Sequence, residues 1–169
     1  TDPLKELSTW NFERDSLSIA TSLAVFYGEN IMDIARVKSG YGAKSMINLE
    51  AYVLKNLSAT DKKLAFEKTI NQLSSQFGTW RTKWGDINRF QRISAGIRPE
   101  FNDDLESLPV GFTSSAWGSL AAFGSKTQAG TKKRYGTLGN SFVAIVEFGP
   151  KINAHSIVTG GSSSNLNSP

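Results

Sequence analysis

The 169-residue chain is long enough for one domain with a sizeable core, and its 39% apolar and 20% charged residues are ordinary for a soluble protein. It contains no cysteine, which excludes a disulfide framework and thiolate metal sites. The net charge of +4 is mild, and the main basic cluster, Lys132 to Arg134 with Lys126 close by, is typical of a solvated turn, which argues against a nucleic-acid-binding protein.

The first 78 residues carry helical patterns. Asp15-Ser16 resembles a helix cap, and apolar residues then recur at spacings of three and four as far as Gly40, which predicts an amphipathic helix of about five turns. Met46 to Leu57 predicts a second, shorter helix. Thr60-Asp61 is expected to cap a third, which ends just before Gly78. The apolar face of that third helix comprises Leu64, Ile70, Leu73 and Phe77.

Aromatic residues interleaved with glycine, proline and serine follow Gly78, so the second half should contain loops and strands. Ile93 to Glu106 includes Pro99 and is expected to be a loop. Trp117 to Phe123 is expected to form a strand, and Gly124 to Lys133 a polar turn region.

The most apolar strand-like run lies near the end of the chain, at Ser141 to Glu147. Its side chains are apolar on both faces, which predicts an interior strand covered on two sides. Gly149 to Lys151 breaks the run, because proline fixes φ and lacks a donor. A second strand is expected from about Ile152 to Val158, which makes an antiparallel hairpin. Helices first and strands last indicate an α+β fold.

Three motifs follow one another along the second half of the chain. Two are Trp84 to Phe90 and Leu108 to Gly111. The third is a closing pattern of Tyr135, Gly136, Gly139, Ser141, Glu147, Phe148, Gly149, Gly160, Gly161, Ser162, Ser168 and Pro169. In this order they resemble the C-terminal portion of the penicillin acylase (penicillin amidase) family of N-terminal nucleophile hydrolases, close to the cephalosporin, aculeacin and acyl-homoserine-lactone acylases. The chain departs from them in having Gly161 where many have glutamine, and in stopping at Pro169 where relatives continue.

The resemblance implies a fold and an activity. Residues 1–169 would be a single C-terminal fragment of the acylase catalytic domain, mainly helical over 1–78 and with loops and antiparallel strands over 79–169. It would form part of an αββα sandwich. The whole protein would hydrolyse the acyl side-chain amide of β-lactams or acyl-homoserine lactones through an acyl-enzyme, a role in antibiotic metabolism. The catalytic nucleophile would lie outside this segment, so the isolated chain should be inactive and no catalytic residue, metal or cofactor is assigned.

The resemblance also implies partners and a location. The partners would be the N-terminal part of the large chain, the small chain and a small-molecule amide substrate, with no nucleic acid or membrane. Without the remainder, exposed apolar surface should lead to self-association. A periplasmic or secreted location is expected from the family. Thr1 to Lys5 does not lead into an apolar signal segment, and no apolar run approaches the roughly 20 residues that span a bilayer.

Several residues could carry chemistry on their own. An N-terminal threonine can act as a nucleophile with its own amine as the base, but Thr1 leads into Asp2-Pro3 where the family nucleophile leads into an apolar strand. A serine–histidine triad would need His155, the sole histidine, which is expected on a strand surface, on the face of Asn153 and Ile157. Ser141 opens a strand and lacks the strand-to-helix turn of a nucleophile elbow, which also argues against a triad.

Other motifs favour structural interpretations. Gly124 to Thr127 lacks the spacing of a phosphate-binding loop and is expected to be a turn. Asp103, Asp104 and Glu106 could hold Ca²⁺ but are typical of a solvated acidic loop. Trp84 to Arg89 is expected to be a structural turn, and Gly160-Gly161 part of a flexible tail.

Two alternatives of other classes remain open at this stage. A non-catalytic ligand-binding or interaction module should be a closed monomer without a large exposed apolar patch. A self-contained threonine N-terminal hydrolase should hold Thr1 in a cleft with its amine near its own hydroxyl.

Overall fold

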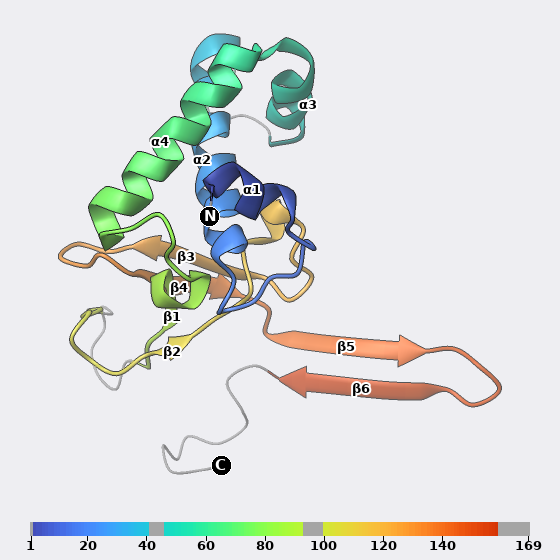
Figure 1. Ribbon diagram of the computed structural model, residues 1–169. Coiled ribbons are helices and arrows are strands. Elements are labelled where there is room, and N and C mark those ends of the chain that lie inside the picture. The colour runs from blue at the N-terminus through green and yellow to red at the C-terminus, as the bar shows by residue number, and fades with distance from the viewer. Residues whose placement is uncertain (1, 41–45, 93–99, 159–169) are drawn as a thin grey trace.

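The computed structural model describes residues 2–40, 46–92 and 100–158 as an α+β fold, which confirms the predicted class (Figure 1). Helices occupy the first half and mostly antiparallel strands the second, an arrangement consistent with a fragment of the hydrolase sandwich. The helices are α1 (Pro3–Ser8), α2 (Ile19–Ser39), α3 (Met46–Asn56), α4 (Ala59–Phe77), α5 (Trp84–Ile87) and the 3₁₀ helix η1 (Ser115–Trp117). The strands are β1 (Asn88–Phe90), β2 (Leu108–Pro109), β3 (Phe123–Thr127), β4 (Arg134–Gly139), β5 (Phe142–Glu147) and β6 (Asn153–Val158). Within these ranges no helix is long and apolar enough to cross a membrane.

The three main helices lie where the sequence predicts them, but two of their caps do not. Helix α2 is capped by Ser18, whose hydroxyl accepts from the Thr21 amide, so the cap at Asp15-Ser16 is wrong. Helix α4 is capped by Ser58, and Asp61 completes a capping box from inside the helix. The cap at Thr60-Asp61 is therefore wrong as well. Gly40 and Gly78 end α2 and α4 in the left-handed conformation, as predicted.

The core lies between α2 and the elements packed on its two ends. One cluster joins α2 to α4 and α5 through six buried residues: Leu23, Val25, Phe26, Leu73, Trp84 and Ile87. A second joins α2 to α3 and α4: Ile31, Met32, Ala35, Leu49, Leu57 and Ala65. The predicted α4 face is only partly right, because Leu73 is fully buried whereas Leu64 is 55% exposed. Ala65 and Thr69 take the positions against α2, where small side chains let the two helices approach.

A four-stranded sheet of order β2-β1-β4-β3 packs beneath the helices (Figure 1). Its β1–β4 pair is parallel, a departure from the expected antiparallel strands of the second half, and the other two pairs are antiparallel. The predicted strand from Trp117 to Phe123 is wrong, because η1 and a non-strand segment occupy those residues. The predicted turn at Gly124 to Lys133 is partly wrong, since β3 runs on to Thr127 and pairs with β4, a strand that was not predicted.

The closing hairpin β5–β6 is confirmed, with Phe142 opposite Val158 and Glu147 opposite Asn153. It extends away from the rest of the chain as a separate two-stranded sheet (Figure 1). The prediction of an interior strand covered on two sides is wrong for this chain. Phe142 is 57% exposed and Ile145, on the opposite face, is 70% exposed, because most of the hairpin extends away from the other described elements (Figure 1).

Candidate functional site

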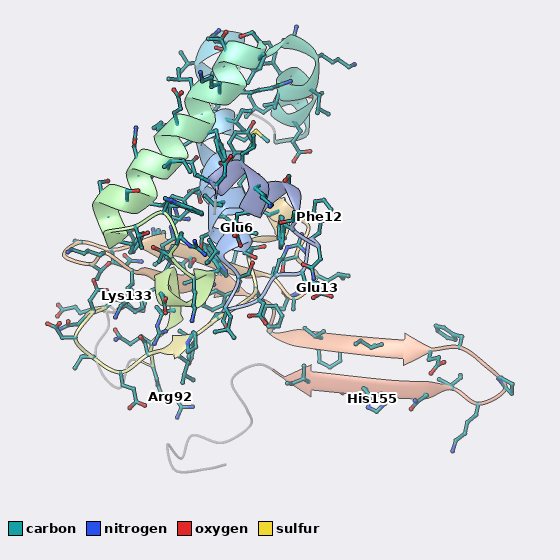
Figure 2. All side chains as sticks on the ribbon, viewed as in Figure 1. Glu6, Phe12, Glu13, Arg92, Lys133 and His155 are labelled. Carbon is teal, nitrogen blue, oxygen red and sulfur yellow. The ribbon has the colours of Figure 1, made fainter. Side chains whose placement is uncertain are left out.

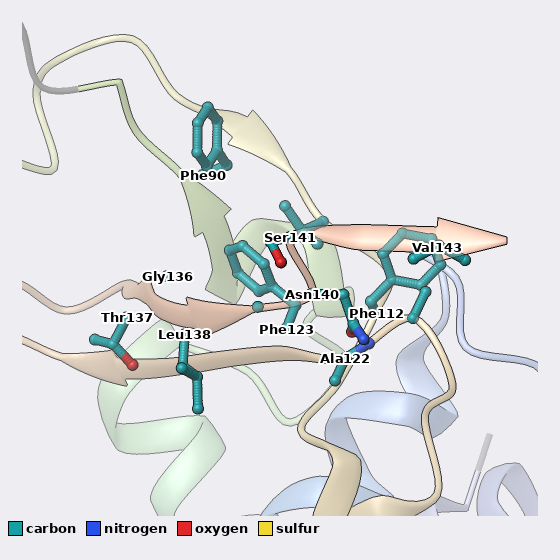
Figure 3. A pocket seen from close by; sticks show the side chains of 13 residues that line it. Phe90, Phe112, Ala122, Phe123, Gly136, Thr137, Leu138, Asn140, Ser141 and Val143 are labelled. Atoms are coloured by element: carbon teal, nitrogen blue, oxygen red, sulfur yellow. The ribbon is translucent and has the colours of Figure 1, made fainter. Parts of the chain in front are cut away.

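An open cleft of about 590 Å³ lies where β1, β3 and β4 meet the start of β5. Figure 3 shows the rings of Phe90, Phe112 and Phe123 around it. The apolar lining is completed by Val110, Ala121, Ala122, Leu138 and Val143, with Thr137, Asn140 and Ser141 as the polar members. A hollow with this lining is suited to apolar groups and carries no charged side chain.

Exposed apolar side chains continue from the cleft along the hairpin. We call this set the apolar surface: Phe90, Leu108, Phe112, Leu138, Phe142, Ile145, Val146, Phe148, Ile152 and Ile157. Each of these side chains is at least 43% exposed. The set covers the cleft and both faces of the hairpin. Monomeric proteins rarely leave this much apolar surface exposed in one region unless something binds there. The apolar surface is therefore the strongest candidate for a functional site in the described ranges.

A buried amide fixes the strands that carry the cleft. Asn88, fully buried at the start of β1, donates to the carbonyl oxygens of Val110 and Phe112 at 2.8 and 2.9 Å. Its own oxygen accepts from the Ser125 hydroxyl of β3 at 2.5 Å. One side chain thus joins β1, β3 and the segment after β2, and satisfies groups that would be costly to bury unpaired.

Tyr135 of β4 ties the sheet to the loop at 100–106. Its ring stacks on Phe101 with centroids 4.9 Å apart, and its hydroxyl donates to Asp103 at 2.9 Å. Burial, followed by the neighbouring Asp103 carboxylate, raises the pKa of Tyr135 to about 12. Burial also tends to raise the pKa of Asp103, but the backbone amides of Lys132 and Lys133 and the Tyr135 hydroxyl outweigh it and lower that pKa.

Two of the three motifs and the start of the third lie in the four-stranded sheet. Trp84 to Phe90 forms α5 and β1, Leu108 to Gly111 contains β2, and Tyr135 to Gly139 lies in β4 (Figure 1). The glycine at position 136 leaves room for Phe123, because a Cβ there would lie 2.4 Å from that ring. The third motif continues through β5 of the hairpin to Gly149. In the described ranges the motif residues build the two sheets and do not form a catalytic group.

The candidate nucleophiles and bases are not brought together. Thr1 lies outside the described residues. His155 is exposed in β6, opposite Ile145, and Figure 2 shows it out on the hairpin. Ser141 lines the cleft just before β5, but the sole histidine of the sequence is absent from that lining. The expected surface position of His155 is confirmed, and no Ser–His pair forms in the described ranges.

The remaining candidates have structural roles where the structure shows them. Gly124 to Thr127 lies in β3, which is a strand and not the expected turn. Asp103 is held by hydrogen bonds from Tyr135 and the following backbone, and the described residues contain no group of three metal-ligating side chains. Trp84 to Arg89 has the expected structural role, but it forms α5 and the start of β1 and not a turn. Trp84 is buried, and Arg89 donates to the Gly85 carbonyl and to Ser107. Gly160 and Gly161 lie outside the described residues.

Sequence reasoning missed the cleft itself. Phe90 ends the Trp84 to Phe90 motif and Phe112 is one of the aromatic residues interleaved with glycine and proline, so neither pattern places them in a cleft. Their surface position depends on strand pairing over about twenty residues, between β1 and β2, which local periodicity does not report. The sequence feature that points to this region is the apolar pattern on both faces of β5, which is typical of a strand that packs against other protein on both sides.

Comparison with known proteins gives one match. The family model described as penicillin amidase matches residues 1–169, which is the entire chain. A search of curated proteins finds no match.

Proposed function

Because the chain belongs to the penicillin amidase family, we propose that it is the C-terminal portion of the catalytic domain of an N-terminal nucleophile amide hydrolase. The whole enzyme removes acyl side chains from β-lactams or acyl-homoserine lactones, as the cephalosporin, aculeacin and acyl-homoserine-lactone acylases do. The nucleophile attacks the amide carbonyl, an acyl-enzyme forms and water hydrolyses it. The nucleophile and the groups that stabilise the oxyanion come from outside residues 1–169.

The apolar surface carries this proposal. A strand such as β5, apolar on both faces and exposed on both, favours burial against other protein. Both outer edges of the hairpin are also free among the described residues, since β5 and β6 pair only with each other. Further strands pairing at these edges, with packing over both faces, would place the hairpin inside a sandwich. We propose that the occupant is the remainder of the acylase: the N-terminal part of its large chain, together with its small chain.

The apolar surface also discriminates against the two alternatives. A self-sufficient interaction module should expose no large apolar patch, whereas this chain exposes one across the cleft and hairpin. A self-contained threonine hydrolase depends on Thr1, and the sole histidine of the sequence lies out on the hairpin and is absent from the cleft lining. The family supports a periplasmic or secreted location, and the apolar surface supports self-association of the isolated chain.

Activity measurements test the proposal in two steps. The purified 169-residue chain is assayed against penicillin G and an N-acyl-homoserine lactone, and we expect no turnover. In the complete protein, Ile145→Lys should abolish hydrolysis, because a charge on the hairpin face prevents its burial. Gln76→Lys, on the exposed end of α4, is the matched control and should leave hydrolysis unchanged.

Two results would contradict the proposal. The first is turnover by the isolated chain that Thr1→Ala abolishes, which would establish a self-contained enzyme. The second is full activity of the complete protein carrying Ile145→Lys, which would mean that the hairpin face stays in water.

A further inference from the structure

A second, smaller pocket lies at the N-terminal half of α2, between the segment at residues 10–14 and the loop that contains η1. Its volume is about 220 Å³. We call it the aromatic pocket; Trp10, Phe12, Arg14, Thr21, Ala24, Val25, Thr113 and Trp117 line it. None of these residues belongs to the apolar surface, and nothing in the proposed function uses them.

Two of the aromatic walls are fixed. The indole of Trp117 packs so closely on α2 that a Cβ at Gly28 would lie 2.8 Å from its ring. The indole nitrogen of Trp10 donates to the Glu13 carbonyl at 2.9 Å, which holds that ring at the mouth of the pocket. Rigid aromatic faces of this kind bind planar rings by stacking.

A cation with unused donors lies in the same lining. Arg14 is half-buried and donates from Nη2 to the Trp117 carbonyl at 2.5 Å, which orients the guanidinium. Within residues 2–40, 46–92 and 100–158 it forms no ion pair and no other hydrogen bond. A guanidinium has five N–H donors, so several remain for a ligand, and carboxylates match its planar fork.

The rim of the pocket is strained. Phe12 is the single non-glycine residue with positive φ among the described ranges, at 65°, and its side chain is 74% exposed. Figure 2 shows it in the loop beside α1. Such a conformation is unfavourable for a residue with a side chain and persists where the surroundings impose it. The Phe12 ring lies 5.3 Å from that of Trp10, so a bound ring would bury apolar surface that the free chain leaves in water.

We infer from this geometry that the aromatic pocket binds a small aromatic carboxylate, with its ring against the Trp10–Phe12 pair and Trp117 and its carboxylate on Arg14. The pocket is smaller than the roughly 300–1,000 Å³ typical of drug-sized ligands, which limits it to about one ring. This site does not depend on the proposed function, because no residue of the cleft or hairpin takes part.

The test is a titration of the 169-residue chain with benzoate, followed by the indole N–H signals of its four tryptophans in nuclear magnetic resonance spectra. We expect saturable shifts of the Trp10 and Trp117 signals. Trp80 and Trp84 lie outside the pocket and serve as internal controls. Benzamide has the same ring without the charge and should bind at least about fivefold more weakly, because a charge-assisted hydrogen bond is lost.

Substitutions distinguish the contribution of the Arg14 cation to benzoate binding from that of the Phe12 ring. Arg14→Gln should weaken benzoate binding about tenfold and remove the preference over benzamide. Arg92→Gln, an exposed arginine outside the pocket, should change neither. Phe12→Gly should leave the melting temperature unchanged or raised, because glycine adopts positive φ freely, and should weaken binding several-fold.

The inference is overturned if no saturable shift occurs, if all four tryptophan signals move alike, or if folded Arg14→Gln binds benzoate as the parent chain does. Phe12→Gly, which does not remove the Arg14–Trp117 bond, provides the second variant if Arg14→Gln fails to fold. Unchanged benzoate affinity in that variant would equally contradict the assigned site.

Discussion

The two sheets of this chain lie in opposite environments, and the more apolar sheet, the hairpin, is the exposed one. In the four-stranded sheet Tyr135 is fully buried, covered by the loop at 100–106, and helices pack on the sheet from one side. In the hairpin β5–β6, Ile145 is 70% exposed and both faces lie open. A two-stranded sheet is marginal in water unless something packs on it. This difference in burial distinguishes residues of the four-stranded sheet, which stabilise this chain, from residues of the hairpin, which we propose bind a partner.

The largest effect on the packed body should come from Trp84→Ala. Trp84 is 2% exposed in the core of α2, α4 and α5, and its indole N–H donates to the Phe112 carbonyl. Removing a buried tryptophan side chain leaves a cavity, and we expect the free energy of unfolding to fall by about 3–5 kcal/mol. Urea denaturation followed by circular dichroism measures it. The partly buried Trp80, changed to alanine, should cost much less.

The same Asn→Asp change should distinguish the two sheets. At position 88 it replaces two amide donors with a carboxylate facing two carbonyl oxygens, and should cost about 2–3 kcal/mol. At Asn153, exposed in β6, it should cost less than about 0.5 kcal/mol. Thermal melts of both variants check this, and equal losses would mean that the buried amide does not hold the sheet.

Acid should weaken the contact between the sheet and the loop. The pKa of Asp103 is lowered in the folded chain, so its stabilising contribution is present above the unfolded value of about 4. That contribution is lost as the pH falls through the folded pKa. Asp103→Asn should therefore lower the unfolding free energy by about 1 kcal/mol at neutral pH and flatten its fall in acid. Asp104→Asn is the matched neighbour, and similar pH profiles for the two variants would rule out this role for Asp103.

The smallest effect on stability is expected in the hairpin. Ile145→Thr keeps a β-branched side chain and should change the unfolding free energy of the isolated chain by less than about 0.5 kcal/mol. It should also reduce self-association, measured by sedimentation, because it removes apolar surface. Ile87→Thr makes the same change in the buried core and should cost several times more. A large loss of stability at Ile145 would show that the hairpin already packs within this chain.

The elements that were predicted correctly carry strong local signals. Helices α2 and α4 combine a repeating apolar face with a glycine just past the end, and the hairpin combines two apolar runs with a Gly-Pro break. Their caps were misplaced because several serines and aspartates near each start can cap equally well by sequence. Ser18 and Ser58 are selected only by where the helix begins to pack.

The strands of the larger sheet could not be predicted in this way. β3 and β4 are short and rich in glycine and polar residues, and their pairing depends on distant partners. The parallel pair β1–β4 joins Asn88 to Arg134, and its register leaves no local trace. The candidate site was foreseen in part: the double-sided apolar pattern of β5 marked a surface that needs cover, but its exposure follows from what the rest of the chain leaves uncovered.

Hydrogen–deuterium exchange of the hairpin amides, compared between the isolated 169-residue chain and the complete acylase, tests most directly whether the apolar surface binds the rest of the enzyme. We predict that amides of β5 and β6 exchange rapidly in the isolated chain and are protected by orders of magnitude in the complete protein, while amides of α2 change little. Equal exchange of the hairpin in the two proteins would contradict the proposed partner.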